Sequence, residues 1–525
     1  MPGKVTTTFY SGGDYKGKYI KSQVSIMAIM SLRGGCSSRR SVAWRGDDTI
    51  SSTGNKSSRQ LYSVEQEIAS GYPSTALCSA QDEPSQRQIR QGFRYTRRLK
   101  LGEPMLRIAM ISYHTCPLAT LGGKDTGGMN VYVRELTRQL GKMGIHVDVF
   151  TRSQDDHVPH VLHELGYGNR VVHVPAGPEH PVAKQELANY IPRFVDGIKY
   201  FACEKGIQYD IIHSHYWMSG IAAASLSEAW GGVPIVHMYH TLGEMKNRIA
   251  RSEAEREGEY RIDGEKQVLR RANRIVAATI AEVTQLRFLY KAPADKLVVI
   301  PPGVDVSHFY PIPADEAKMY VGLKPEDRMV LFVGRIEPLK GVDTLIQAMS
   351  CLQAREPHPV HLAIIGGDPA VSPQEMSTEM ARLQKLCDDL SVGQTVVFLG
   401  KRDQDKLPYY YSAAELLVMP SHYESFGMVA LEAMACGTPV IASEVGGLAY
   451  LVRDGETGFT IPDQEPDTLC EKISWLLNDR ELHARMSARA VEYAQDYAWE
   501  KIANQILDIY VGLVQQKKVS RAAHL

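Results

Sequence analysis

A glycine-rich loop at residues 114–130 has the composition of a phosphate-binding site. The loop His114–Asn130 contains Gly122-Gly123 and Gly127-Gly128, follows an apolar run and precedes an amphipathic helix pattern. Glycine lets a backbone approach a ligand closely, and the free N–H groups at the start of a helix suit a phosphate. The loop therefore predicts a phosphate site; a flexible loop without a ligand is the alternative.

A second segment, Gly334–Gly341, places Arg335 and Lys340 five residues apart just after another apolar run. An arginine offers a planar fork of donors and a lysine a compact charge, which together can hold a diphosphate. Ordinary solvated surface charge is the alternative.

A third segment carries Glu424 and Glu432, eight residues apart. This spacing is a little over two helical turns, so both carboxylates can face one ligand. Ser425-Phe426-Gly427 reads as the start of the helix, with N–H groups open to a phosphate. On spacing alone, two surface glutamates are the simpler interpretation.

Histidines follow two further expected strands, in His213-Ser214-His215-Tyr216 and in His240-Thr241. Two histidines in H-S-H could ligate a metal, but no further ligand stands at a recognisable spacing, and no metal site is predicted. His240 is either a buried core histidine or an active-site residue. Its position at a strand end beside Thr241 favours the second interpretation at least equally.

Positioning these segments requires alternating strands and helices in two halves. Apolar runs typical of buried parallel strands alternate with helical patterns from Leu106 onward. Strand–helix alternation predicts an α/β fold with two doubly wound parallel sheets, whose ligands lie beyond the carboxyl ends of the strands, here in a central cleft. The strands are expected at Leu106–Tyr113, His146–Phe150, Ile211–His213, Ile235–Met238, Arg274–Ala277, Val298–Ile300, Met329–Val333, His361–Ile365, Val396–Leu399, Leu416–Met419 and Pro439–Ala442.

A length of 525 residues also requires more than one core. The predicted domains are residues 105–302 and 303–495, each Rossmann-like, followed by residues 496–525. The last segment contains a helix pattern near Trp499–Val514 that is long enough to pack back on the first domain.

The first 104 residues differ from the rest, with 16 Lys and Arg against 8 Asp and Glu and no sustained period. Such a composition predicts disorder. Three interpretations stay open: a basic tail that binds an anionic partner, a targeting segment, or upstream sequence from a mis-set start, since Met105 directly precedes the first clean strand.

The net charge of -1 gives no global attraction to nucleic acid, and no apolar run is long enough for a membrane span. Eight scattered cysteines without a C-x-x-C pair suit reduced thiols and a cytoplasmic location.

Taken together, and in this order, the three motifs resemble glycosyltransferase family 4 over roughly Leu106 to Val514. The resemblance implies a retaining hexosyltransferase of GT-B fold: two Rossmann-like domains that face a cleft holding a nucleotide-sugar donor. It implies that Arg335, Lys340, Glu424 and His240 are the catalytic residues, that no cofactor beyond the UDP-sugar substrate is required, and that the partners are small molecules. A homodimer is left open.

The first half resembles more closely the branch of this family that transfers N-acetylglucosamine from UDP to an inositol phosphate. The matching stretches are HTCPLATLGGKDTGGMNVYV, HSHYWMSG and HTLGEMKN. The resemblance implies that Arg335 and Lys340 hold the diphosphate and that Glu432 holds the ribose. The further donor-binding residues it implies are His114, Gly127, Gly128, Gly427, Met428 and Val429. The acceptor-binding residues it implies are Asn130, Lys184, Tyr216, Thr241 and Arg261.

Other functions remain open at this point. Sucrose-phosphate synthases, which use UDP-glucose, also carry the G-G, H-S-H-Y and paired-glutamate motifs; Met129-Asn130 modestly favours an inositol phosphate. A non-catalytic nucleotide-sugar-binding protein and a sugar-nucleotide 2-epimerase would share the fold. A dinucleotide-dependent oxidoreductase is disfavoured because no G-x-G-x-x-G segment is present.

Overall fold

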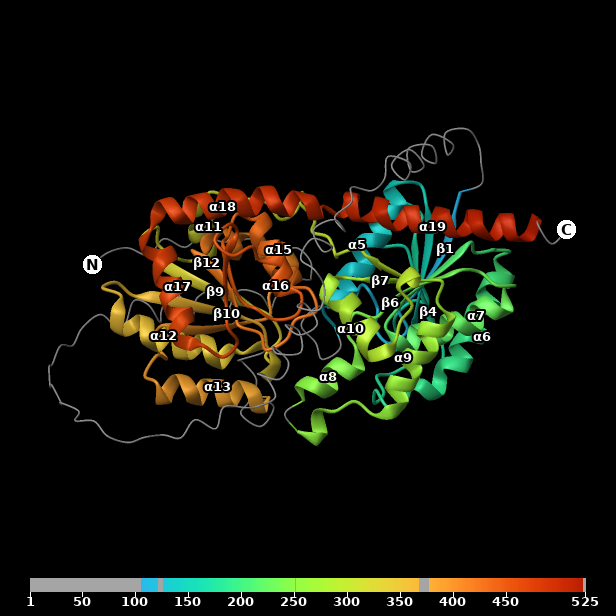
Figure 1. The fold of residues 1–525 in the computed structure, drawn as a ribbon, viewed down its shortest axis with the longest axis horizontal. Coiled ribbons are helices and arrows are strands. Elements are labelled where there is room, and N and C mark those ends of the chain that lie inside the picture. Colours follow the sequence, from blue (N-terminus) through green and yellow to red (C-terminus); the bar gives the residue numbers. More distant parts are fainter. Residues whose placement is uncertain (1–104, 121–125, 251, 368–376, 523–525) are drawn as a thin grey trace, which may run out of the picture.

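Two parallel sheets form the core of the protein. The structure, a computed structural model, describes residues 105–120, 126–250, 252–367 and 377–522. Residues 1–104, for which disorder is predicted, lie outside the described residues, and so does the pair Gly122-Gly123. Figure 1 shows the two halves side by side, each a sheet covered by helices.

The first half contains an eight-stranded sheet in the order β3-β4-β2-β1-β5-β6-β7-β8. All neighbouring strands are parallel except β3, which is antiparallel to β4. In strand β1 every side chain after the first residue is buried, as expected for a strand of a parallel sheet that is covered on both faces. The strands are β1 (Arg107–Ile111), β2 (His146–Arg152), β3 (Val161–Leu162), β4 (Arg170–Val174), β5 (Ile211–His215), β6 (Ile235–Met238), β7 (Arg274–Ala277) and β8 (Leu297–Val299).

The second half contains a six-stranded parallel sheet in the order β11-β10-β9-β12-β13-β14. Its strands are β9 (Arg328–Val333), β10 (Val360–Ile365), β11 (Val396–Gly400), β12 (Leu416–Met419), β13 (Val440–Ser443) and β14 (Gly458–Ile461).

Helices cover both faces of each sheet. Those of the first half are α5 (Gly128–Lys142), α6 (Ile191–Glu204), α7 (Trp217–Ala229), α8 (Gly243–Ile249), α9 (Glu259–Arg271) and α10 (Ile280–Tyr290). Those of the second half are α11 (Ala314–Val321), α12 (Val342–Arg355), α13 (Thr378–Asp389), α14 (Leu407–Ala413), α15 (Met428–Ala435), α16 (Leu448–Leu451), α17 (Pro466–Asn478) and α18 (Arg480–Ala494).

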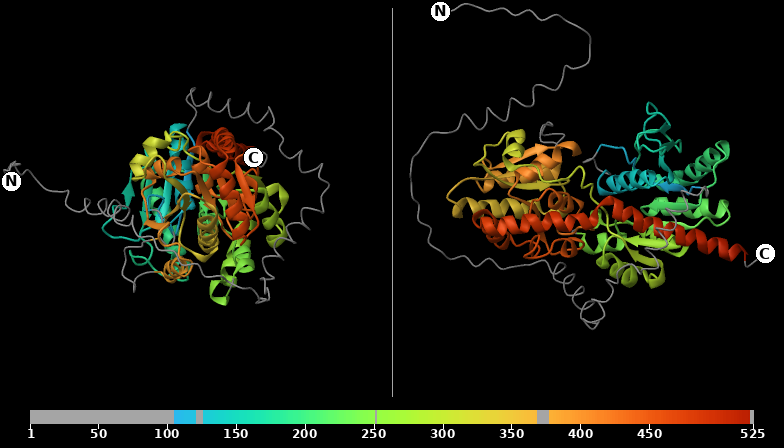
Figure 2. Two further views of the ribbon diagram at one scale, coloured as in Figure 1. Left: turned by 90° about the vertical axis from the view of Figure 1, so that its left-hand side faces the viewer. Right: turned by 90° about the horizontal axis from the view of Figure 1, so that it is seen from above.

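The last helix, α19 (Trp499–Ala522), runs from the second half across the first, as Figures 1 and 2 show. Trp499 packs edge-on against Tyr132 of α5, with ring centroids 5.3 Å apart. Further along, the Tyr510 hydroxyl lies 2.6 Å from Nδ1 of His213 on β5. The helix therefore joins the two halves through buried aromatic contacts.

Both sheets reverse their strand order next to their first strand, and the motifs gather there. In the first sheet β2 and β5 flank β1; in the second, β10 and β12 flank β9. Ligands of such sheets bind beyond the carboxyl ends of the strands at this reversal. The His114 loop follows β1, Tyr216 follows β5, Arg335 follows β9 and Glu424 follows β12.

The prediction of two doubly wound sheets is confirmed, and each expected strand is present within two residues at each end. Strands β3, β4 and β14 were not predicted. Strand β3 has two residues, β4 mixes arginine and histidine into its apolar run, and β14 begins with a glycine, so none gives a clear periodic signal. The domain boundaries stay a prediction.

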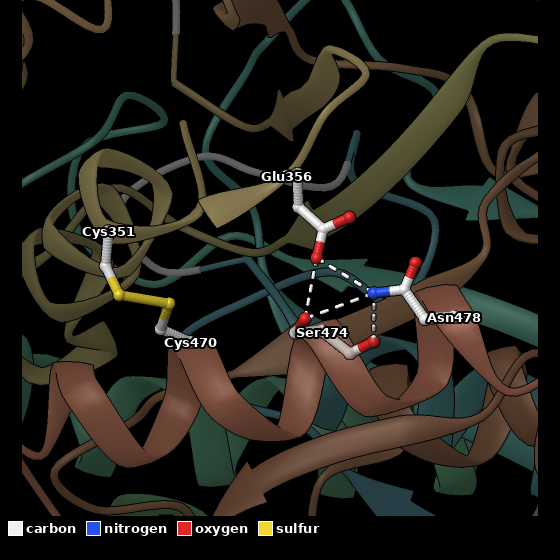
Figure 3. The surroundings of a disulfide bond; sticks show 5 residues. All are labelled: Cys351, Glu356, Cys470, Ser474 and Asn478. Atoms are coloured by element: carbon white, nitrogen blue, oxygen red, sulfur yellow. Dashed lines mark hydrogen bonds between the residues drawn. A yellow bond between two sulfur atoms is a disulfide. The ribbon is translucent and has the colours of Figure 1, made fainter. Parts of the chain in front are cut away.

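The expectation that every cysteine is reduced is wrong for one pair, because Cys351 of α12 and Cys470 of α17 form a disulfide. Figure 3 shows the polar contacts beside it: Glu356 accepts hydrogen bonds from Ser474 Oγ at 2.6 Å and from Asn478 Nδ2 at 2.9 Å. The two cysteines are 119 residues apart. Spacing could not reveal a pair brought together only by helix packing.

We expect the variant Cys351→Ala to lose about 2–4 kcal/mol of unfolding free energy under oxidising conditions, because the cross-link restricts the unfolded chain. Guanidinium unfolding with and without dithiothreitol measures this loss. The reductant should destabilise the wild type and leave the variant unchanged. Equal midpoints for the wild type in both conditions, with no cross-linked peptide by mass spectrometry, would contradict the disulfide.

Candidate active site

The centre of the second half's site is an ion pair between the second and third motifs. Lys340 Nζ lies 2.5 Å from Glu424 Oε2, and both side chains are largely buried. Burial would raise the pKa of Glu424, but the charge and hydrogen bond of Lys340 hold that pKa below its usual value. The ion pair therefore fixes the ends of both side chains relative to each other.

Arg335 lies at the end of β9 and pairs with Glu337 at 2.7 Å. Its side chain is 41% exposed, unlike that of Lys340. Arg335 is therefore the more exposed cation of the two, whereas Lys340 is held in place by Glu424.

The N-terminus of α15 faces the N-terminus of α5 across the two halves. Gly427 precedes α15 with φ +104, a conformation that favours glycine, and a Cβ there would meet Leu448 at 2.5 Å. A Cβ on Gly128, the first residue of α5, would meet the sulfur of Met428 at 3.2 Å. The N-termini of two helices thus border the same space, an arrangement that suits an anion.

Glu432, further along α15, borders a pocket of 260 Å³ between the halves. Its Oε2 accepts a 2.9 Å hydrogen bond from the Tyr411 hydroxyl. Burial raises the pKa of Glu432 to about 7, although Tyr411 and nearby Arg134 oppose the shift. Arg134 of α5 also donates to Gln404 of the second half, so this contact crosses between the halves.

A glycine pair that shapes the site was not among the predicted site residues. Gly446-Gly447 follows β13 and packs against the backbone of Glu424: a Cβ on Gly446 would meet the Glu424 carbonyl at 2.2 Å, and the Gly447 N–H donates to that carbonyl at 2.8 Å. The signal was available, since paired glycines after a strand mark a close backbone approach.

In the first half, His240 lies at the carboxyl end of β6 with φ +61. It borders one pocket with Thr241 and, from the second half, with Ser425 and Gly446. Burial lowers the pKa of His240 to about 3, so the ring is neutral at ordinary pH. His114 is similar: burial, aided by Lys184, lowers its pKa to about 3, and its ring packs on Tyr216 with centroids 4.5 Å apart.

Four of the five predicted acceptor residues form one cluster. Lys184 Nζ lies 5.0 Å and Arg261 Cζ 5.1 Å from the centre of the Tyr216 ring. Arg261 Nη2 donates to Thr241 Oγ1 at 3.0 Å and to the Thr241 carbonyl at 3.1 Å. Two cations against one aromatic ring make a site suited to an anionic group.

Arg261 is fully buried and holds this cluster together. Its Nε bonds to Glu265 at 2.9 Å and its Nη1 to Glu257. Burial alone would lower the pKa of Arg261, but Tyr216, Glu265 and Glu257 raise it above its usual value. The guanidinium is therefore permanently charged and fixed in direction.

Asn130, the fifth acceptor residue, is buried and engaged within its own loop. Its Oδ1 accepts from the Gly127 N–H at 2.9 Å, and its Nδ2 donates to Thr115 Oγ1 and to the Cys116 carbonyl, both at 2.7 Å. Both amide hydrogens are thus used, and Asn130 shapes the loop after β1 in this structure.

In the H-S-H segment, Nδ1 of His213 lies 2.6 Å from the Tyr510 hydroxyl, and Nδ1 of His215 lies 3.0 Å from Nε2 of His240. Within the described ranges, the residues grouped closely enough to hold a metal are Asp155, Asp156 and His157, all exposed. Exposed acidic groups are common without an ion.

The arrangement suits transfer between two anionic ligands. The second half offers Lys340, Arg335 and a helix N-terminus to one anion, and the first half offers Lys184 and Arg261 to another. His240 and Glu424 lie at the border between them. No helix among the described residues combines the length and the apolar composition that crossing a membrane requires.

Two family models match the two halves of the chain. Residues 126–308 match the model described as Glycosyltransferase Family 4, and residues 315–493 match that described as Glycosyl transferases group 1. The two matches meet near the start of the second sheet.

Curated relatives match almost over their full length. The chain is 38% identical to D-inositol 3-phosphate glycosyltransferase 2 of Catenulispora acidiphila, over 80% of this chain and 98% of that protein. It is 39% identical to D-inositol 3-phosphate glycosyltransferase of Acidothermus cellulolyticus, over 80% and 93%.

Solved structures share the fold. Sucrose-phosphate synthase from Thermosynechococcus elongatus matches with a TM-score of 0.71 and 36% identity, over 78% of this chain and all of that one. Anabaena HepE in complex with UDP and glucose matches with a TM-score of 0.60 and 21% identity, over 78% and 100%. The GT-B prediction is confirmed by these neighbours.

Proposed function

The chain belongs to glycosyltransferase family 4, a GT-B hexosyltransferase family that includes these relatives, and we propose that it transfers N-acetylglucosamine from UDP to an inositol phosphate with retention of configuration. The donor lies against the second half and the acceptor against the first.

The observation that supports this proposal most is the pairing of two cationic sites across one cleft. Lys340, fixed by Glu424, and the N-terminus of α15 supply the donor side. Lys184 and Arg261, both packed on Tyr216, supply the acceptor side. A phosphorylated acceptor explains the second cationic site, which a neutral sugar acceptor would not need.

The reaction breaks the bond between the sugar's anomeric carbon and the UDP oxygen. Negative charge develops on the leaving diphosphate, where Lys340, Arg335 and helix N–H groups stabilise it. The acceptor hydroxyl attacks from the same face and gives its proton to the departing phosphate. Contact between the halves excludes water, which limits hydrolysis of the donor.

A second candidate acceptor follows from the 36% identity to a sucrose-phosphate synthase. That function would use UDP-glucose and fructose 6-phosphate with the same mechanism. The acceptor site binds a phosphate in both cases, so its charge does not separate the two.

The deciding experiment follows UDP release by the full chain from UDP-N-acetylglucosamine and from UDP-glucose. Each donor is tested alone, with inositol 3-phosphate and with fructose 6-phosphate. We expect release from UDP-N-acetylglucosamine only with the inositol phosphate. Release from UDP-glucose with fructose 6-phosphate would support the second function instead. If neither acceptor increases the release of UDP, both functions are rejected.

Donor binding should weaken below neutral pH. Ribose hydroxyls donate best to an ionised carboxylate, and the pKa of Glu432 is about 7. As pH falls through 7 the carboxylate is protonated, and the affinity should fall roughly tenfold, the difference between a charged and a neutral hydrogen bond. Calorimetry with UDP-N-acetylglucosamine from pH 5.5 to 8.5 measures this, because its diphosphate does not titrate there.

The control for this titration is Glu432→Gln, which has the same shape and no charge to lose. Its affinity should equal that of the protonated wild type at every pH. A wild-type affinity that is flat across the range would remove Glu432 from ribose binding.

A further inference from the structure

A buried histidine behind His240 has no role in the function proposed above. His215, the last residue of β5, places its Nδ1 3.0 Å from Nε2 of His240, which follows β6. The neighbouring strands are parallel, and this contact joins the ends of both. Nε2 of His240 is therefore occupied within the protein, and Nδ1 is the ring nitrogen left for a ligand.

The ring of His215 cannot turn away from this contact. It is fully buried and packs between His213, 4.3 Å away between centroids, and Tyr132, 5.5 Å away. Tyr132 also packs edge-on against His240 at 5.4 Å. Tyr510 of α19 holds His213 from the other side at 2.6 Å. The direction of His240 is thus fixed by a closed set of rings from β5, α5 and α19.

Hydrogen positions follow from burial. Both rings are neutral, because burial lowers the pKa of His215 and of His240. A neutral imidazole carries one hydrogen, so one of the two rings must donate across the 3.0 Å contact. Nε2 of His215 is buried and has no hydrogen-bond partner.

That orphaned nitrogen decides the direction. If His240 donated, His215 would carry its own hydrogen on Nε2, as a buried N–H without an acceptor, which is rare and costly. If His215 donates from Nδ1, its Nε2 carries no hydrogen and is left as an acceptor without a donor. The second arrangement places the hydrogen of His240 on Nδ1.

We propose that His215 is a positioning residue: by donating its Nδ1–H to His240, it fixes His240 as a neutral Nδ1–H donor toward an oxygen of the bound sugar. His240 then donates a hydrogen bond and does not serve as the base that deprotonates the acceptor. The kinetic part of this inference rests on the proposed function; the position of the hydrogen does not.

The backbone agrees with a fixed ring. His240 has φ +61 and Tyr216, directly after His215, has φ +72. Non-glycine residues are held in this region only where the surrounding structure enforces it, and they cluster at functional sites. Two of them at the ends of neighbouring strands place both side chains at the cleft.

The first test is the hydrogen itself. The full chain with ¹⁵N-labelled histidine gives a long-range ¹H–¹⁵N spectrum, in which the His240 ring is identified by its absence from His240→Asn. We expect Nδ1 protonated and Nε2 bare from pH 8 to 5. A hydrogen on Nε2 of His240 would overturn the proposal, whatever the enzyme's substrates.

The second test uses a matched pair at His215. His215→Asn places an amide N–H near the position of Nδ1, and His215→Leu removes the donor. We expect the leucine variant to lose roughly threefold to tenfold in kcat, the effect of one neutral hydrogen bond, with the acceptor KM unchanged and mixed His240 tautomers. The asparagine variant should recover most of the rate.

His237→Leu is the control for lost core packing, because His237 is also fully buried but bonds to Ser214 instead of His240. It should lower stability and leave the His240 spectrum unchanged. Equal kcat for the leucine and asparagine variants at position 215, or a wild-type His240 spectrum in His215→Leu, would reject the positioning role. Absence of any transfer in the wild type would instead reject the proposed function, and the spectrum would still decide the hydrogen.

Discussion

Lys340→Ala is expected to lower kcat for glycosyl transfer roughly 10²–10³-fold, the typical effect of removing one preorganised charge donor. Lys340 is the largely buried cation of the donor site, and Glu424 fixes its ammonium at 2.5 Å. Because the charge on UDP develops only as the bond breaks, the loss should fall on kcat more than on the donor KM. Steady-state UDP release with saturating acceptor measures both.

The loss of Lys340 also leaves Glu424 without the cation that lowers its pKa. The double variant Lys340→Met with Glu424→Gln removes this unpaired charge and should recover stability without recovering rate. Lys385→Ala, at an exposed lysine of α13 in the same half, is the control and should transfer at the wild-type rate. A loss below roughly tenfold in Lys340→Ala would contradict the leaving-group role.

Arg261→Ala is expected to lower the free energy of unfolding by about 3–5 kcal/mol, because it leaves a buried carboxylate without its cation. Glu265 is fully buried at the other end of the ion pair, and Glu257 bonds to the same guanidinium. The variant should also raise the KM for inositol phosphate, since the fork that borders Tyr216 is gone. Guanidinium unfolding and acceptor titration measure the two effects.

The two effects of Arg261 are separated by Lys184→Ala. Lys184 lies over the same Tyr216 ring but is only half-buried, so its loss should leave the unfolding free energy within about 0.5 kcal/mol. The KM for inositol phosphate should rise roughly tenfold, the loss of one charged hydrogen bond, while the KM for the donor stays constant. Unchanged acceptor KM in both variants would remove this cluster from acceptor binding.

The sequence alone determined the elements and the motifs that follow them. Apolar runs such as that of β1 and the pattern of α5 are local signals, because each depends only on side chains a few residues apart. The same is true of Arg335, Lys340, Glu424 and Tyr216: each follows a strand, and the carboxyl ends of parallel strands are where ligands of such sheets bind.

Only the tertiary structure decided which of these residues meet. The order of strands brings Lys340 to Glu424, 84 residues away, and His215 to His240. The tertiary structure also directs the Asn130 side chain toward the backbone of its own loop, and it joins Cys351 to Cys470. Such contacts depend on sheet order and helix packing, which bring distant segments together through buried surfaces that no local period encodes.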